Sequence, residues 1–142
     1  MTTLPRPIVD RLFLDSSVLF SAAHKPDALC RRLWDLSDVV LLASSYVLEE
    51  ARRNLDTRER LDRLDDLIGA LVLVEDDAPL PPWVQLVEKD EPILQGALTG
   101  KATHLLTGDK KHFRELLGTH VEGILVLQPG DYLAQRLEFC EG

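Results

Sequence analysis

The chain has 142 residues, of which 45% are hydrophobic and 28% are charged, as expected for a folded soluble protein. No run approaches the roughly 20 apolar residues of a membrane span, and the N-terminus lacks the apolar segment of a secretory signal, so we expect a cytoplasmic protein without a membrane segment. With a net charge of −8, the chain has no basic stripe of the kind that duplex-DNA binders use.

Short apolar runs alternate with amphipathic segments through the first half of the chain. Aliphatic runs predict buried strands, whereas apolar residues spaced by three and four predict helices. In chain order, we predict a strand over residues 11–15, a helix from residue 16, a helix over 28–36, a strand over 38–44, helices over 44–55 and 58–70, and a strand over 71–75.

Prolines interrupt the middle of the chain, where Pro79, Pro81, Pro82 and Pro92 exclude a long helix over residues 76–92. The alternation of helices and strands then resumes. We predict a helix over residues 92–98, a strand over 104–107, a helix over 110–118, a strand over 123–127 and a helix over 131–138.

Strands that alternate with helices predict an α/β fold. Right-handed βαβ units place helices on both faces of one sheet, so we expect a doubly wound parallel sheet of about five strands. No linker divides the chain, and its length suits a single domain over residues 1–142. In such sheets, ligands bind at the carboxyl ends of the strands, where the strand order reverses.

Four acids are candidates for that edge of the sheet. Asp15 and Asp109 each follow a predicted strand directly, although an aspartate there also suits the N-cap of the next helix. Asp90 lies on the apolar stripe of its predicted helix, unless Pro92 begins that helix and leaves Asp90 in solvent. Glu50 lies nearer the apolar face of its helix than its neighbour does, unless it pairs on the surface with a polar residue of the same helix.

Four inward carboxylates require a compensating positive charge. Two unit charges 4 Å apart repel by about 4 kcal/mol at an effective dielectric constant of 20. Either some of these groups have raised pKa values, or a hard divalent cation binds among them. Ligation by oxygen alone favours Mg²⁺ or Mn²⁺ over Zn²⁺.

The four acids stand in the motifs FLDSSVL, YVLEEARRNL, DEPILQGAL and HLLTGDKKHF. In order, spacing and context, these motifs resemble those of bacterial PIN (PilT N-terminus) domains, the ribonuclease fold of VapC-type toxins, and the resemblance spans about residues 8–133. Ser17 and Thr107 take the supporting polar positions of that family. His112 departs from its pattern, because many toxin-type members have an aspartate there.

The resemblance implies a metal-dependent endoribonuclease that cleaves phosphodiester bonds of single-stranded RNA, with Mg²⁺ or Mn²⁺ as cofactor and a role as the toxin of a toxin–antitoxin pair. A cognate antitoxin and a second copy of the chain are then the expected protein partners. The family's catalytic and metal-binding acids fall on Asp15, Glu50, Asp90 and Asp109. Lys110 and Lys111 are candidate phosphate contacts, or simply a solvated helix start.

Two other functions are consistent with the same fold. A haloacid-dehalogenase-like phosphotransferase would use Asp15 as its nucleophile, but Ser17 stands where the second aspartate of that site is needed. A catalytically inert PIN-like module would keep the acidic pocket and bind a protein partner instead. No aromatic residue is interleaved among the basic ones, so the sequence predicts no surface for stacking bases.

Overall fold

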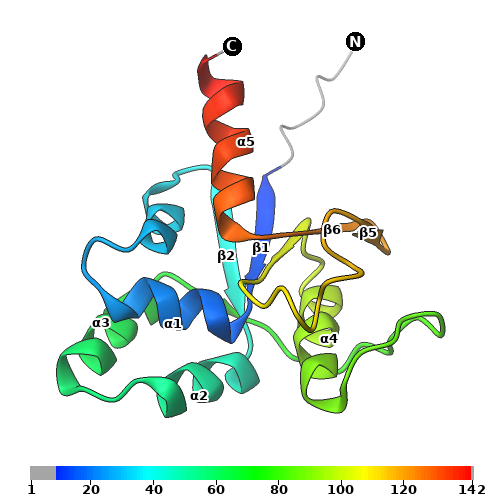
Figure 1. Ribbon diagram of the computed structural model, residues 1–142, viewed down its shortest axis with the longest axis horizontal. Coiled ribbons are helices and arrows are strands. Elements are labelled where there is room, and N and C mark those ends of the chain that lie inside the picture. Colours follow the sequence, from blue (N-terminus) through cyan, green and yellow to red (C-terminus); the bar gives the residue numbers. More distant parts are fainter. Residues whose placement is uncertain (1–8, 142) are drawn as a thin grey trace, which may run out of the picture.

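The computed structural model describes residues 9–141, with side chains up to residue 136. Within this part of the chain, one sheet of six strands has the order β3-β2-β1-β4-β6-β5 (Figure 1). The strands are β1 (Asp10–Leu14), β2 (Val39–Ala43), β3 (Val72–Leu73), β4 (His104–Leu106), β5 (His120–Val121) and β6 (Ile124–Leu127). Neighbouring strands are parallel except for β5 and β6, so the predicted parallel sheet is confirmed.

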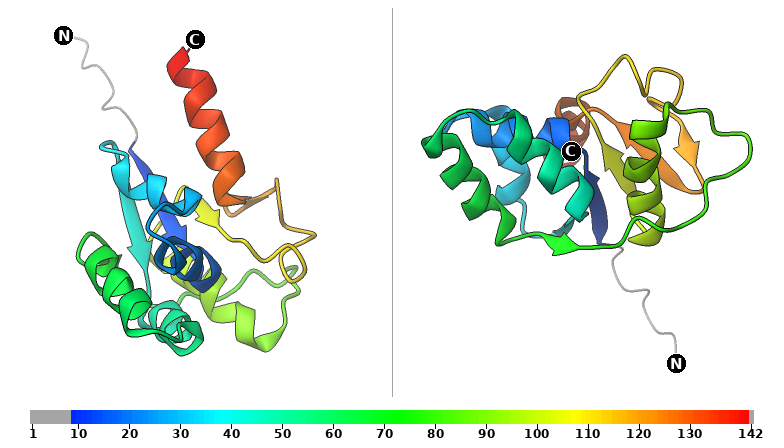
Figure 2. Two further views of the ribbon diagram at one scale, coloured as in Figure 1. Left: turned by 60° about the vertical axis from the view of Figure 1, so that its left-hand side comes forward. Right: turned by 90° about the horizontal axis from the view of Figure 1, so that it is seen from below.

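Helices cover both faces of this sheet. They are α1 (Ser16–His24), the 3₁₀ helix η1 (Leu29–Asp35), α2 (Ser45–Asn54), α3 (Arg58–Ile68), the 3₁₀ turn η2 (Glu88–Asp90), α4 (Glu91–Thr99) and α5 (Pro129–Glu141). The chain moves from β1 to β2 to β3 and then returns to β4 on the other side of β1. Because βαβ crossovers are right-handed, α1, α2 and α3 lie on one face and α4 lies on the opposite face (Figure 2).

The helix predicted over residues 110–118 is wrong. This segment consists of turns, in which the amide of Phe113 donates to the carbonyl of Asp109 without the continuous ladder of a helix. The Asp109 side chain accepts hydrogen bonds from two amides that follow it, and Phe113 is fully buried. The Asp109 hydrogen bonds resemble those of a helix N-cap, so tertiary burial of Phe113 is what overrides the helical periodicity of this stretch.

Smaller departures from the prediction concern short elements. The helix expected over residues 28–36 is a 3₁₀ helix, and the strand expected over 71–75 has only two paired residues. The strand that the sequence did not predict is β5. It forms a tight hairpin with β6 through Glu122 and Gly123, both of which have positive φ angles. A two-residue strand is too short to produce a periodic pattern in the sequence.

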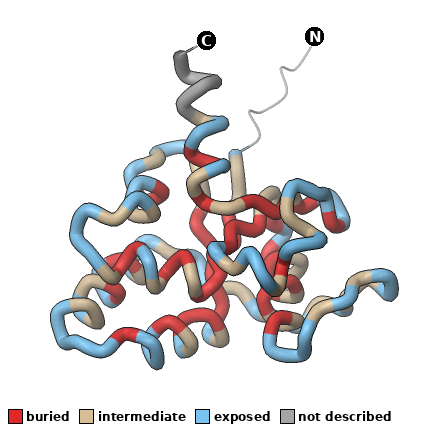
Figure 3. The backbone as a smooth tube through the Cα atoms, in the orientation of Figure 1, coloured by how far each residue is buried: buried red, intermediate tan, exposed pale blue. Residues whose placement is uncertain are grey.

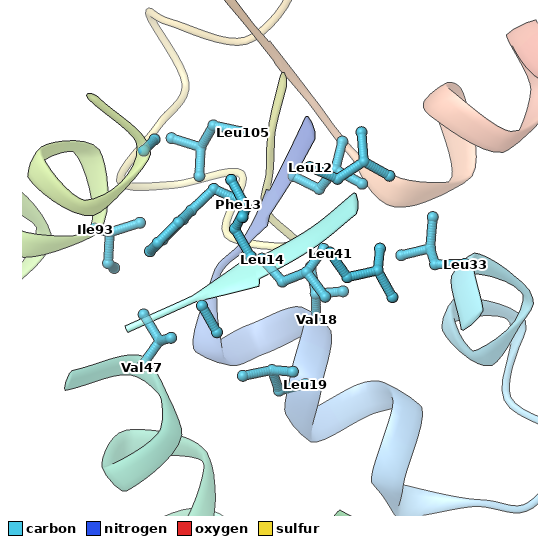
Figure 4. Close-up of a cluster of buried hydrophobic side chains, with 14 of the residues drawn as sticks. Leu12, Phe13, Leu14, Val18, Leu19, Leu33, Leu41, Val47, Ile93 and Leu105 are labelled. Carbon is cyan, nitrogen blue, oxygen red and sulfur yellow. The ribbon is translucent and has the colours of Figure 1, made fainter. Parts of the chain in front are cut away.

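The core lies along the central strands, as the buried residues in Figure 3 show. Leu12, Phe13 and Leu14 of β1 are all inaccessible to solvent. Figure 4 shows Phe13 and Ile93 on the side of α4, whereas Leu12 lies toward η1 and α5. Among the described residues, no helix is both long enough and apolar enough to cross a bilayer.

A close contact between α4 and β1 depends on a glycine. A Cβ atom added at Gly96 would lie 2.6 and 2.7 Å from two ring atoms of the buried Phe13. We expect Gly96→Ala to lower the free energy of unfolding by about 1–2 kcal/mol, because overpacking costs about 1–3 kcal/mol and exceeds the gain of about 1 kcal/mol in helix propensity. Urea denaturation measures this change.

The matched control is Gly69→Ala at the end of α3. A Cβ atom there would lie at an ordinary contact distance of 3.5 Å from the carbonyl oxygen of Asp66. We expect this variant to stay within about 0.5 kcal/mol of wild type. Equal stabilities of the two alanine variants would contradict the proposed contact between α4 and Phe13.

Candidate functional site

The carboxyl ends of β1 and β4 lie side by side at the point where the strand order reverses. Leu14 pairs with Leu106 in register, and the amide of Asp15 donates to the carbonyl of Leu106 at 3.0 Å. Asp15 and Thr107 are the residues that follow, and both are buried. The Thr107 hydroxyl donates to Oδ2 of Asp15 at 2.7 Å, which joins the two strand ends.

Asp15 is also the N-cap of α1. Its Oδ1 atom accepts a hydrogen bond of 2.6 Å from the amide of Ser16, and the Ser17 hydroxyl lies 3.3 Å from Oδ2. Burial raises the pKa of Asp15, hydrogen bonds from Thr107 and Ser16 lower it, and the charge of Glu50 raises it. Asp15 is therefore held rigidly by groups that favour its charged form, in a place where burial opposes that charge.

Glu50 turns toward Asp15, as its position in α2 predicts. Its neighbour Glu49 is exposed, whereas Glu50 is half-buried. The Ser16 hydroxyl donates to Oε1 of Glu50 and lies 3.3 Å from Oδ1 of Asp15. Ser16 thus bridges the two acids, a role that the sequence analysis did not assign to it.

Asp90 precedes its helix, as one of the two predicted arrangements has it, but its side chain is buried, as the other has it. The helix α4 begins at Glu91 with Pro92 in its first turn, so Asp90 precedes the helix. Its side chain is nevertheless buried, with only 4% of the residue exposed, and makes no capping hydrogen bond. Atom Oδ2 of Asp90 has no hydrogen-bond partner, which is costly for a buried polar atom.

Asp109 and His112 complete this side of the site. Oδ1 of Asp109 accepts hydrogen bonds from the amides of Lys111 and His112, at 3.1 and 3.0 Å. The ring atom Nδ1 of His112 lies 2.8 Å from Oδ2 of Asp109 and 3.1 Å from Oδ2 of Asp90. Neither contact has the geometry of a hydrogen bond, so Nδ1 of His112 and Oδ2 of Asp90 both lack a hydrogen-bond partner. The two contacts are ion pairs only when the His112 ring is protonated.

Electrostatic interactions link the pair Asp15 and Glu50 to the group of Asp90, Asp109 and His112. Burial raises the pKa of Asp90, His112 lowers it, and the charges of Asp109 and Glu50 raise it. Glu50 also raises the pKa of Asp15, so its charge acts on both Asp15 and Asp90. The charges of the four predicted acids therefore act on one another at the carboxyl end of the sheet.

Tyr46 of α2 lies within this electrostatic region. Burial raises the pKa of its hydroxyl group, and the charges of Glu50, Asp90 and Asp15 raise it further. The hydroxyl donates a hydrogen bond of 2.6 Å to the carbonyl of Lys89, directly before Asp90. Tyr46 thereby ties α2 to the turn that carries Asp90.

The donor set fits a divalent cation. Single ligand atoms of Asp90, Asp109 and His112 all lie within 4.8 Å of one another. The unpartnered oxygen of the buried Asp90 gives a second reason to place a positive charge there. Asp15 and Glu50 lie outside that set of three, and the roles of all four acids as ligands stay predictions.

The two predicted phosphate contacts are both exposed. Lys111 lines a pocket of about 540 Å³ with Trp83, Arg114 and His112, among other residues. Lys110 is not part of that lining. The structure thus brings an aromatic side chain, 56% exposed, beside two basic residues that lie far from it in the sequence.

Ser16, His112 and Trp83 were not assigned to the site from the sequence. The spacing of Asp109 and His112 predicts that their side chains lie close together. Their contact with Asp90 could not be predicted, because Asp90 lies on another segment. Ser16 looks like an ordinary residue of a helix start, and only its contact with Glu50 reveals the bridge. Trp83 stands in a proline-rich loop whose path no periodic pattern predicts.

No family model matches the sequence, and no curated protein is similar to it in sequence. Solved structures do match. A chain of VapBC2 from Rickettsia felis, crystallised with a DNA fragment from its promoter, is 15% identical with a TM-score of 0.61 and covers 83% of this chain and 98% of its own. VapC20 from Mycobacterium tuberculosis, a toxin that cleaves the sarcin-ricin loop, is 16% identical with a TM-score of 0.50 and covers 69% and 91%. The resemblance found in the motifs is therefore confirmed at the level of the fold, and the chain has the PIN-like fold of the VapC toxins.

Proposed function

We propose that the protein is a metal-dependent endoribonuclease that cleaves phosphodiester bonds of single-stranded RNA. The observation that carries this proposal is the gathering of four acids from separate segments at the switch point of the sheet, where the buried Asp90 has an oxygen without a partner. Ligands bind at this edge of doubly wound sheets. A site rich in carboxylates repels RNA phosphates unless a cation lies between them.

The structural neighbours support a toxin role. VapC20 cleaves the sarcin-ricin loop, and VapBC2 was crystallised on its promoter DNA. We extend these roles to this chain as part of the proposal: RNA is the substrate, a cognate antitoxin is one partner, and a second copy of the chain is another. The phosphotransferase alternative is disfavoured because Ser17, at the position of the second acid, binds Asp15 and the amide of Gly108.

The residues of the site have distinct roles in the proposed reaction. Asp15, Asp90 and Asp109 hold Mg²⁺ or Mn²⁺, and the hydrogen bonds of Asp15 to Thr107 and Ser16 fix its orientation. A divalent cation bound there supplies Lewis acidity, which lowers the pKa of an attacking water and offsets charge on the scissile phosphate. Glu50, steadied by Ser16, orients that water or binds a second cation.

The substrate reaches the acids through the pocket beside His112. Lys111 and Arg114 supply positive charge for the phosphates on either side of the scissile bond, and the exposed ring of Trp83 offers a face for one unpaired base. Glu115, which also lines the pocket, limits its positive charge. Lys110 is a more distant contact for the RNA backbone.

An RNA cleavage assay tests the proposed function. We expect a labelled oligonucleotide with the sarcin-ricin loop sequence, or an unstructured RNA, to be cleaved in Mg²⁺ or Mn²⁺ and to survive in excess chelator. Asp15→Asn and Glu50→Gln lose at least about 100-fold in rate, because electrostatic stabilisation of the transition state is removed. Glu49→Gln, on the exposed side of the same helix, keeps the wild-type rate.

Equal and metal-indifferent rates in wild type and Asp15→Asn would remove this proposal. Such a result would leave the inert interaction module as the better account. A contaminating nuclease is recognised by activity that does not change across the variants.

A further inference from the structure

His112 introduces a nitrogen atom into a site that otherwise offers oxygens. Its Nδ1 atom lies 2.8 Å from Oδ2 of Asp109 and 3.1 Å from Oδ2 of Asp90. Bonds of about 2.1 Å to one octahedral ion place neighbouring ligand atoms about 3.0 Å apart. Both contacts of His112 match the edge of such an octahedron.

The contacts are not explained by hydrogen bonding within the protein. Nδ1 of His112 and Oδ2 of Asp90 have no hydrogen-bond partner despite their short separation. The Asp90 side chain is only 6% exposed, so its unpartnered oxygen lies away from bulk solvent. The two contacts are ion pairs only when the His112 ring is protonated. With a neutral ring, the three ligand atoms of Asp90, Asp109 and His112 converge without shared hydrogen bonds, as they would around a cation.

The backbone orients the Asp109 carboxylate that faces the ring. The amides of Lys111 and His112 both donate to Oδ1 of Asp109, which leaves Oδ2 of that carboxylate facing the ring. Asp90 approaches from η2, on the other side. These hydrogen bonds fix the Asp109 carboxylate opposite the His112 nitrogen without any bound ion.

We infer that His112 is a metal ligand and that it shifts the ion preference of the site from Mg²⁺ toward first-row transition ions. Mg²⁺ binds oxygen and retains its waters, whereas an imidazole nitrogen is a good ligand for ions such as Co²⁺, with affinity rising from Mn²⁺ to Co²⁺. This inference rests on the proposed function, because it names the ion of the same site. It differs from the all-oxygen set that the sequence predicts.

Metal binding to the full chain, without RNA, tests the inference. Titration calorimetry gives the affinities for Mg²⁺ and Co²⁺ in wild type, His112→Asp and His112→Gln, with His120→Gln as the control at an exposed histidine. We expect both His112 variants to lower the ratio of Co²⁺ to Mg²⁺ affinity at least about tenfold. Loss of even a ligand's outer partner lowers metal affinity about 10- to 100-fold, and an imidazole nitrogen contributes more to Co²⁺ binding than to Mg²⁺ binding. The control keeps the wild-type ratio.

Pulsed EPR of bound Mn²⁺ provides a measurement that does not depend on the folding of a variant. Wild type labelled with ¹⁵N-histidine is expected to show a nitrogen coupling to the ion, which persists in His120→Gln and is absent from His112→Gln. No nitrogen coupling in wild type, or an unchanged affinity ratio in both folded His112 variants, would overturn the inference.

The same experiments separate this inference from the proposed function. RNA cleavage in Mg²⁺ without any nitrogen coupling would reject His112 as a ligand and leave the nuclease proposal intact. Nitrogen coupling without RNA cleavage under any metal would support His112 as a ligand and reject the nuclease proposal.

Discussion

Asp90→Asn is expected to reduce metal-dependent RNA cleavage by at least about 100-fold, the scale of losing one electrostatic group in an active site. Asparagine keeps the size of the side chain and removes the negative charge from the buried oxygen that lacks a partner. The variant should therefore fold normally and fail in the step that needs the cation. Single-turnover cleavage at saturating protein measures this loss separately from weak RNA binding.

The control for this variant is its neighbour in sequence. Glu91→Gln removes a charge one residue away, at a half-buried position outside the cluster of Asp90, Asp109 and His112. We expect its cleavage rate to stay within about twofold of wild type, because screening weakens a charge that does not touch the site. Similar losses in the two variants would mean that net charge, not ligation, controls the rate.

Thermal unfolding should reveal the cost of the unpaired carboxylate and its relief by metal. Burial raises the pKa of Asp90 above that of the unfolded chain. Below about pH 3.9 the carboxyl is protonated in both states and has no effect on stability. From about pH 3.9 up to the raised folded-state pKa, the unfolded chain ionises while the folded carboxyl keeps its proton, so the stability falls. Above the folded-state pKa the folded protein holds a buried charge, and its stability stays lower at neutral pH.

In chelator at pH 7, Asp90→Asn is therefore expected to melt at a higher temperature than wild type, with the difference vanishing as the pH approaches 3. Addition of Mn²⁺ at 100 times its Kd should stabilise wild type by about 2.7 kcal/mol, or roughly 10 °C for a chain of this size. The variant should not respond to the ion. Scanning calorimetry in chelator and in Mn²⁺ measures both changes, and equal responses of the two proteins would place the ion elsewhere.

The local sequence determined the main architecture and the approximate positions of three of the site's acids. Aliphatic runs place β1 and β4, and the parallel arrangement brings their carboxyl ends to one edge. Asp15 and Asp109 follow those runs directly, so their approximate place depends on chain neighbours alone. The periodicity of α2 likewise separates the inward Glu50 from the exposed Glu49, because the spacing of apolar residues indicates which face of a helix packs against the core.

Contacts between distant segments were decided by the tertiary structure. Asp90 is buried although it precedes its helix, because the turn before α4 is held against α2 by Tyr46. The bridge from Ser16 to Glu50 likewise joins segments 34 residues apart.

The structure of the segment after β4 also could not be predicted from its sequence pattern. It has a helical pattern but forms turns, because burial of Phe113 in the core overrides that pattern. Spacing in a sequence reports which face of an element is apolar, whereas the direction of a polar side chain depends on partners that only the folded chain supplies.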